Sequence, residues 1–298
     1  MNTASPTLIP DAYIPSPSSS SFHLGPLHFH VYGIMYVFAV AAAIIISRHR
    51  WAKRGGDPDL VYEVAWWGFP AGLIGGRIYF LITTPNQVPD HWWGPFAIWN
   101  GGLGIWGGIA AGVAVGVWRL RKHLDRADVM RFVNAATPGL LVAQAFGRVG
   151  NYFNQELFGK PSTLPWALKI SPEHRPPHYA QYATFQPTFL YEIIWNLLLA
   201  GILVWLDNRR KIRPPGLFPL YVAGYSAFRI FEETLRIDYS AHILGMRLNF
   251  WIALIGMLGG IAWFLWIQTR QPTDAGDGSG AASPRRRPSP AYSRSAPR

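Results

Sequence analysis

The stretch Leu248-Asn-Phe-Trp-Ile-Ala-Leu-Ile-Gly-Met-Leu-Gly-Gly-Ile-Ala-Trp-Phe-Leu-Trp-Ile267 runs for 20 residues without a charged side chain. A helix needs about 20 mainly apolar residues to cross the hydrocarbon core of a bilayer, because its backbone polar groups must be satisfied within the segment. Similar stretches lie upstream at Val31–Ser47, Val61–Thr83, Phe96–Trp118, Phe132–Gly147, Thr188–Leu206 and Gly216–Leu235. The sequence therefore predicts an all-α integral membrane protein of about seven transmembrane helices.

The composition supports lipid as the solvent of these stretches. Hydrophobic residues make up 50% of the 298 residues and charged residues only 14%, whereas a typical soluble domain carries roughly a quarter of its residues as charges. The fourth stretch is an exception, because it is short and contains Asn134, Pro138 and Gln144. We expect that helix to be broken, tilted or shielded from lipid by its neighbours.

Lysine and arginine indicate the orientation, because they are retained in short cytoplasmic loops. Residues 1–29 and 84–95 contain neither residue type. The basic residues instead follow the first, third and fifth stretches: Arg48, Arg50, Lys53 and Arg54; Arg119, Arg121, Lys122, Arg126 and Arg131; Arg209, Arg210, Lys211 and Arg213. The pattern predicts an external N-terminus and a cytoplasmic C-terminus.

Charge and cysteine content narrow the classes of function. The net charge of +11 comes mostly from these loops and from the C-terminal tail, which favours contact with anionic lipid head groups over nucleic acid. The chain has no cysteine, which excludes disulfides, a thiol nucleophile and thiolate metal sites. We expect neither a metal nor a cofactor.

Composition also predicts the domain organisation. Residues 1–25, rich in Ser and Pro, are expected to be a disordered external segment, and residues 269–298 a disordered basic cytoplasmic tail. Residues 26–268 form the transmembrane domain. Within it we expect an external loop at 148–187, and a loop of that length is often functional.

Glycines recur at a spacing of four residues in the second and third stretches. They are Gly68, Gly72 and Gly76, and Gly104, Gly108, Gly112 and Gly116. This spacing is typical of close packing between membrane helices. The segment Trp99–Gly108 holds five glycines, which favours a bent or unwound backbone there.

A polar motif follows the fourth stretch: Gly147-Arg-Val-Gly-Asn-Tyr-Phe-Asn-Gln-Glu-Leu-Phe-Gly159. Ionisable groups at membrane depth are candidates for function. A structural alternative is that Arg148 reaches the interface and pairs with Glu156.

The sixth stretch carries a second set of polar residues. Tyr225, Arg229, Glu233 and Arg236 step by four, four and three positions, so they share one helical face. The alternative is a structural stripe, in which Arg229 and Glu233 cancel each other's charge as an i,i+4 pair.

Further polar residues belong to the same outer side in this orientation. They are His28, His30 and Tyr32 at the first helix, Arg77 near the end of the second, and Glu192 in the fifth. The histidines are typical interfacial anchors. A dry cavity containing Arg148, Arg229 and Arg77 suits a phosphate, because planar guanidinium groups match its oxygens. A phospholipid head group is the anion available at that depth.

The motifs together resemble the prolipoprotein diacylglyceryl transferase family of bacteria. The resemblance covers roughly residues 26–268, and the Gly147–Gly159 motif is its most specific part. The supporting matches are His30-Val-Tyr-Gly-Ile-Met-Tyr36, Gly75-Gly-Arg-Ile78, Gly101-Gly-Leu103, Pro187-Thr-Phe-Leu-Tyr-Glu192 and Gly224-Tyr-Ser-Ala-Phe-Arg-Ile230.

The resemblance implies an enzyme of the bacterial plasma (inner) membrane that it crosses several times. Its substrates would be phosphatidylglycerol and prolipoprotein signal peptides with a lipobox cysteine. The sn-1,2-diacylglyceryl group would move to that thiol, giving a thioether and glycerol phosphate. The substrate brings the thiol, so the enzyme needs no cysteine of its own.

The resemblance also implies roles for individual residues. Arg148 and Arg229 would hold the phosphate, with Asn151 and Glu233 completing the catalytic group. Glu233 could orient Arg229 or Arg236. The head-group pocket would involve the remaining candidates, which are Tyr32, Arg77, Asn154, Glu156, Gly159, Tyr225 and Arg236.

Three positions depart from the family pattern. Trp106 and Gln186 stand where many members have histidine, and Asn134 stands where many have an acidic residue. A mechanism with either histidine as the base therefore does not carry over. The base stays open between Glu156, Glu233, Tyr32 and ionisation of the thiol by solvent and nearby arginine.

A transporter or channel whose buried Arg and Glu line a path is the alternative from another class. The charges concentrate in the outer half, and the sequence has no inverted repeat or matched broken helices at the midplane, which are typical of transporters. A polytopic scaffold is a third possibility, and it leaves the charges unexplained.

Overall fold

The computed structural model describes residues 12–25, 27–98, 101–210 and 212–270. Within these ranges the chain forms seven long helices: α1 (Val31–Ala52), α2 (Asp59–Thr83), α3 (Ile105–His123), α4 (Arg126–Asn154), α5 (Thr188–Arg209), α6 (Leu217–Leu235) and α7 (Leu248–Thr269). Three short antiparallel pairs accompany them: β1 (Ser21–Leu24) with β2 (Leu27–His30), β3 (Leu168–Lys169) with β4 (Thr184–Phe185), and β5 (His242–Ile243) with β6 (Met246–Arg247).

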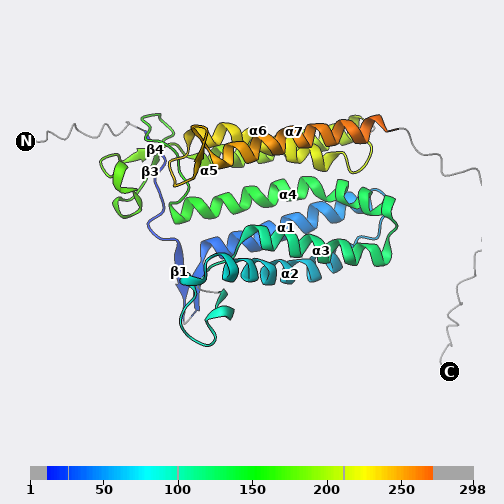
Figure 1. Ribbon diagram of the computed structural model, residues 1–298, viewed down its shortest axis with the longest axis horizontal. Helices are drawn as coiled ribbons and strands as arrows, with labels where there is room; N and C mark the ends of the chain where they lie inside the picture. Colours follow the sequence, from blue (N-terminus) through cyan, green and yellow to red (C-terminus); the bar gives the residue numbers. More distant parts are fainter. Residues whose placement is uncertain (1–11, 26, 99–100, 211, 271–298) are drawn as a thin grey trace, which may run out of the picture.

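The helices lie side by side along the long axis of the molecule (Figure 1). α4 runs between α1, α2 and α3 on one side and α5, α6 and α7 on the other, and it packs against both α1 and α5. The helices α1, α3, α5 and α7 begin at one end, which also carries the strands. We call it the loop end.

The length of α4 differs from that of the predicted fourth helix. The helix is 29 residues long, whereas the sequence predicted only Phe132–Gly147, because polar residues interrupt the apolar run. Asn134 is buried; its Oδ1 accepts from the Leu217 backbone N–H at 2.8 Å, and its Nδ2 donates to Asp207 at 3.3 Å. Neighbouring helices thus shield the polar positions from lipid.

The surface of the bundle is apolar. Large aliphatic and aromatic side chains are exposed along its helices, among them Val37, Trp66, Ile74, Ile105 and Ile255. Such a continuous apolar surface is typical of contact with lipid. Among the described helices, α1, α5 and α7 are long and apolar enough to cross a membrane by length and composition.

The glycines of α2 and α3 make the close contact that their spacing predicts. A Cβ on Gly72 would lie 3.3 Å from the Gly108 carbonyl oxygen, and one on Gly75 would lie 2.5 Å from that of Gly107. The bent glycine segment is also confirmed over residues 101–104, which are not helical. Gly101 and Gly102 there have φ values of +84° and +78°, a region that favours glycine.

The loop end contains more structure than the sequence predicted. Residues 12–25, expected to be disordered, include β1 and a backbone bridge from Ile14 to Leu168. The loop expected at 148–187 begins only after α4 ends at Asn154. Its apolar residues Phe158, Leu168, Ile170 and Phe185 form a small core together with Phe189 at the start of α5. The remaining expected disorder, at residues 1–11 and 271–298, lies outside the described residues.

The close α2–α3 contact makes Gly75 a test of packing. We expect Gly75→Ala to lower the free energy of unfolding by about 1–3 kcal/mol, as overpacking does, because the new Cβ meets Gly107 and Ala111. Gly259→Ala in α7 is the control, since nothing lies within 4 Å of its Cβ position; it should be neutral or slightly stabilising. Thermal unfolding in detergent micelles measures both, and equal midpoints would contradict the packing role.

Candidate active site

Three helices meet at one carboxylate, that of Glu192 on α5. The side chain is fully buried, at 0% exposure. From α4, the Arg148 Nε lies 2.8 Å from its Oε1. From α6, the Tyr225 hydroxyl donates to Oε1 at 3.1 Å, and the Arg229 Nη1 lies 3.8 Å from Oε2. A buried charge requires such partners, so Glu192 ties α4, α5 and α6 together.

A series of ion pairs runs from Arg229 towards the loop end. The guanidinium of Arg229 contacts both Glu232 and Glu233, one turn further along α6. The second oxygen of Glu233 accepts from Arg247 Nε at 2.7 Å. Glu233 therefore joins an arginine of the helix bundle to an arginine of β6.

Asp238, beyond the end of α6, closes the series. Arg236 Nε donates to one of its oxygens at 2.6 Å, and Arg247 Nη2 donates to the other at 3.2 Å. Burial raises the pKa of Asp238, but the hydrogen bond from Arg236 and the charges of Arg236 and Arg247 outweigh it, so the pKa lies below its usual value. This contribution to stability is present at neutral pH and is lost as the pH falls through that lowered pKa.

A second arm extends from Arg148 to Glu156. Arg148 Nη1 donates to Asn151 Oδ1 at 3.1 Å. The amides of Asn151 and Asn154 in turn donate to Glu156 Oε1, at 2.8 and 3.2 Å. Gln155 ends α4 in the left-handed region with φ of 51°. That turn brings Glu156 back towards the last turn of α4, where its N–H donates to the Asn151 carbonyl at 3.1 Å.

The arginines of the site are paired. Four of them, Arg148, Arg229, Arg236 and Arg247, contact four carboxylates, Glu192, Glu232, Glu233 and Asp238. An anion entering the site must therefore use the remaining donors or displace a carboxylate. The described hydrogen bonds of Arg148 use its Nε and Nη1, so its Nη2 is such a donor.

A neutral polar layer lies one helical turn deeper. It consists of Gln144, Asn196 and Tyr221, which stand four residues from Arg148, Glu192 and Tyr225 on the same helices. Gln144 Nε2 donates to the Tyr221 hydroxyl at 2.8 Å. Among the described residues, neither the Nδ2 nor the Oδ1 of buried Asn196 has a hydrogen-bond partner. A cluster that includes Leu141, Leu199, Leu203 and Leu217 lies nearby on the same three helices.

Two residues predicted for the site, Arg77 and Gly159, contact backbone groups instead. The Arg77 guanidinium donates to the carbonyls of Gly94 and Pro95, at 2.8 Å each, and to those of Gly101 and Gly102, at 2.8 and 2.9 Å. The structure thus does not join Arg77 to the ion pairs of the site. Gly159 donates to the Gln186 carbonyl at 2.9 Å, and a Cβ on it would lie 3.0 Å from the Leu235 carbonyl oxygen.

The remaining predicted positions do not take part in the ion pairs of the site. The Tyr32 ring packs on Gly150, where a Cβ would come within 2.3 Å of it. Gln186 donates to Ser162 and accepts from Tyr191, at 3.2 and 2.6 Å. Trp106 is 60% exposed at the start of α3. His28 and His30 are exposed on β2.

Sequence reasoning missed part of the site. Glu232 stands three residues after Arg229, a spacing that signals the same helical face. Glu192 was recognised inside a span but without its central role, which depends on the pairing of three helices. Arg247 offered no signal, since it lies in a short connection and meets Glu233 only through the fold.

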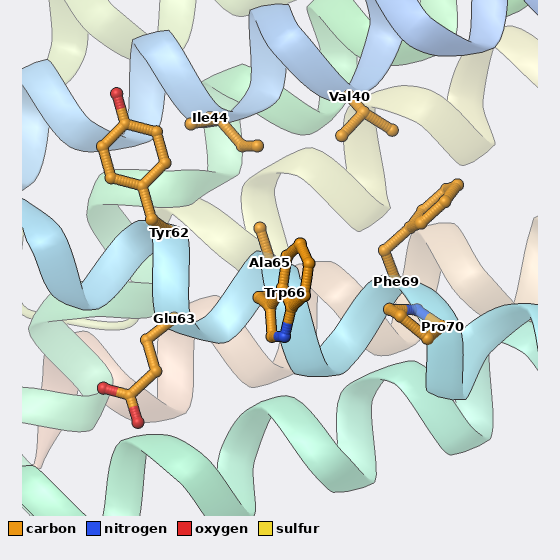
Figure 2. Close-up of a pocket in the computed structure, with 8 residues that line it drawn as sticks. All are labelled: Val40, Ile44, Tyr62, Glu63, Ala65, Trp66, Phe69 and Pro70. Atoms are coloured by element: carbon orange, nitrogen blue, oxygen red, sulfur yellow. The ribbon is translucent and has the colours of Figure 1, made fainter.

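An apolar groove of about 530 Å³ lies between α1 and α2. Figure 2 shows Trp66 and Phe69 of α2 pointing towards Val40 and Ile44 of α1, while Glu63 points away towards α3. Glu63 pairs there with Arg119. The groove contains none of the charged residues of the site, and its apolar lining suits lipid chains.

Fold and site together define a helical membrane protein with polar chemistry held inside its bundle, which is the pattern of a membrane-embedded enzyme. The sequence profile described as prolipoprotein diacylglyceryl transferase matches residues 19–266. The chain belongs to this family.

Named relatives agree with the match. A phosphatidylglycerol–prolipoprotein diacylglyceryl transferase of Frankia alni is 45% identical over 266 residues, which cover 88% of this chain and 69% of the relative. One from Cutibacterium acnes is 43% identical over 273 residues, covering 90% and 91%. Transferase 2 of Streptomyces coelicolor is 42% identical over 265 residues, covering 88% and 83%. These findings give the transporter alternative no support.

The central carboxylate allows a test of the site's role in stability. We expect Glu192→Leu to lower the free energy of unfolding by about 3–5 kcal/mol, because it leaves Arg148, which is mostly buried, without its carboxylate partner. The control is Asp59→Asn, which removes an exposed pair with Arg48 at 3.9 Å and should cost about 1 kcal/mol or less. Thermal unfolding in micelles reports both; comparable losses would show that Glu192 does not organise the bundle.

Proposed function

We propose that this protein transfers the sn-1,2-diacylglyceryl group of phosphatidylglycerol to the lipobox cysteine of prolipoprotein signal peptides. The observation that carries the proposal is the meeting of Arg148 and Arg229 at Glu192, within the residues that match the family profile. The products are a thioether-linked lipoprotein precursor and glycerol phosphate.

The reaction needs help for the leaving group. The cysteine sulfur attacks a glycerol carbon, the carbon–oxygen bond to phosphate breaks, and the phosphate departs with the electron pair. Arginines that meet this developing charge in a dry site stabilise the transition state. Arg148 offers its Nη2, and Glu192 fixes the guanidinium through Nε. Arg229 reaches the phosphate if it exchanges one of its carboxylate contacts.

The reaction also needs a base for the thiol proton, and the geometry favours Glu156 over Glu233. Glu233 lies between Arg229 and Arg247, and each of its two oxygens already contacts an arginine. Glu156 accepts from the neutral amides of Asn151 and Asn154 through Oε1. Its exposed side chain leaves Oε2 for the thiol or a bridging water. Asn151 is then a positioning residue between Arg148 and Glu156.

We propose that residues 26–268 form one transferase domain in the bacterial plasma membrane. The basic loops support the orientation of this domain. The loop end faces outward, so the site lies in the outer half of the bilayer. The basic residues that follow α1, α3 and α5 lie at the opposite end, where Arg50 pairs with Asp207 at 2.6 Å. The C-terminal end of α7 then faces the cytoplasm.

The proposed activity is tested with purified protein, phosphatidylglycerol vesicles and a lipobox peptide. We expect the peptide to gain the mass of one diacylglyceryl group, whereas the same peptide with serine in place of cysteine gains none. Mass spectrometry of the peptide and detection of glycerol phosphate measure the two products. An unmodified cysteine peptide under these conditions would refute the transferase proposal.

The same assay tests the catalytic role of Arg148. Arg148→Gln keeps a hydrogen-bonding side chain but removes the charge, so we expect kcat to fall by about 100-fold or more, as for loss of one transition-state donor. Arg119→Gln removes a cation that pairs with Glu63 on α2 and should leave kcat unchanged. Normal turnover by Arg148→Gln would make that arginine a structural strut.

The absence of cysteine makes the orientation directly measurable. We expect a single cysteine introduced as Ser18→Cys to react with a membrane-impermeant maleimide in intact cells. Lys122→Cys, in the last turn of α3, should react only after the membrane is opened. The reverse labelling pattern would contradict the proposed orientation.

A further inference from the structure

A second pocket, of about 250 Å³, lies at the loop end beside the ion pairs. Its lining includes Lys160, His242, Arg247, Glu233 and Phe250. These residues come from the loop after α4, from β5 and β6, and from the ends of α6 and α7. The pocket is thus formed by four separate parts of the chain.

The fold positions the basic residues of this pocket. His242 and Arg247 are direct partners across the β5–β6 pair, so their side chains lie on the same face of the hairpin. The Lys160 N–H donates to the Leu235 carbonyl at 2.7 Å, and the Lys160 carbonyl accepts from the Gln186 N–H at 2.9 Å. Lys160 is therefore anchored at the end of α6.

The charge of the pocket is not fully compensated. The charge of Arg247 is opposed by Glu233 and Asp238, whereas among the described residues no carboxylate forms an ion pair with Lys160. One carboxylate, that of Glu233, contacts Arg229 through one oxygen and Arg247 through the other. The pocket and the proposed phosphate site thus share a wall.

We propose that this pocket binds a phosphate monoester, the glycerol phosphate released by the transfer. The inference rests on the proposed function. A doubly charged product leaving Arg229 meets Arg247 on the other side of Glu233, and then Lys160 and His242 at the exposed rim. Phosphate favours such clusters of charged donors. The apolar ring of Phe250 provides one wall against the carbon chain of the product.

The test measures binding of sn-glycerol 1-phosphate to the purified full-length protein by calorimetry, without lipid or peptide substrate. We expect Lys160→Gln to weaken this binding about tenfold, as for loss of one charge-assisted contact. Lys169→Gln is the matched control: it removes an exposed lysine of β3 that lies over the Tyr13 ring at 5.1 Å. That variant should bind like the unaltered protein.

Parallel titrations separate the sources of the phosphate. Inorganic phosphate should show the same dependence on Lys160, and glycerol alone should not bind. Phosphatidylglycerol in nanodiscs should bind equally to both lysine variants. Equal binding of glycerol phosphate to the two variants, or a tenfold loss for the lipid as well, would overturn the assignment. The transfer assay on the same preparation tests the proposed function separately. Binding of glycerol phosphate without transfer would contradict the proposed function, and transfer without this binding would contradict the pocket.

Discussion

The structure depends on the need to compensate one buried carboxylate. Glu192 has no access to water, and a lone charge in that position would cost far more than the protein's marginal stability. Arg148 from α4, with Tyr225 and Arg229 from α6, supplies the compensation. Because these partners come from two other helices, charge neutrality fixes the register of α4, α5 and α6. The same requirement brings together the residues to which we assign the chemistry.

This pairing places a constraint on catalysis. The arginines that suit a phosphate are held by carboxylates, so in the proposed reaction a phosphate uses the remaining donor of Arg148 or takes the place of a carboxylate at Arg229. In either case no arginine is left without a counter-charge in a dry site. The ion pairs continue outward through Glu233 and Arg247 to the loop end. In the proposed release of the product, Arg247 is the next cation after Arg229 in this series.

The sequence predicts the parts of this arrangement that are local. Seven apolar stretches correspond to the seven long helices, and one helical face of α6 was read from the spacing of Tyr225, Arg229 and Glu233. The limits of α4 were wrong, because its polar residues are shielded by helices far away in the sequence. Arg77 was assigned to a phosphate site, yet it holds backbone carbonyls. Whether a buried arginine meets a carboxylate, a carbonyl or a ligand depends on tertiary contacts that spacing does not contain.

The central position of α4 has a consequence for biogenesis. Its polar positions are acceptable only beside other helices, and Asn134 meets partners on α5 and at the start of α6, Asp207 and Leu217. These segments are synthesised after α4 itself. A newly made α4 can pack against α1, but Asn134 still lacks its two partners, and a helix of this polarity enters lipid poorly without them. We therefore expect α4 to integrate stably only when α5 and α6 have been made.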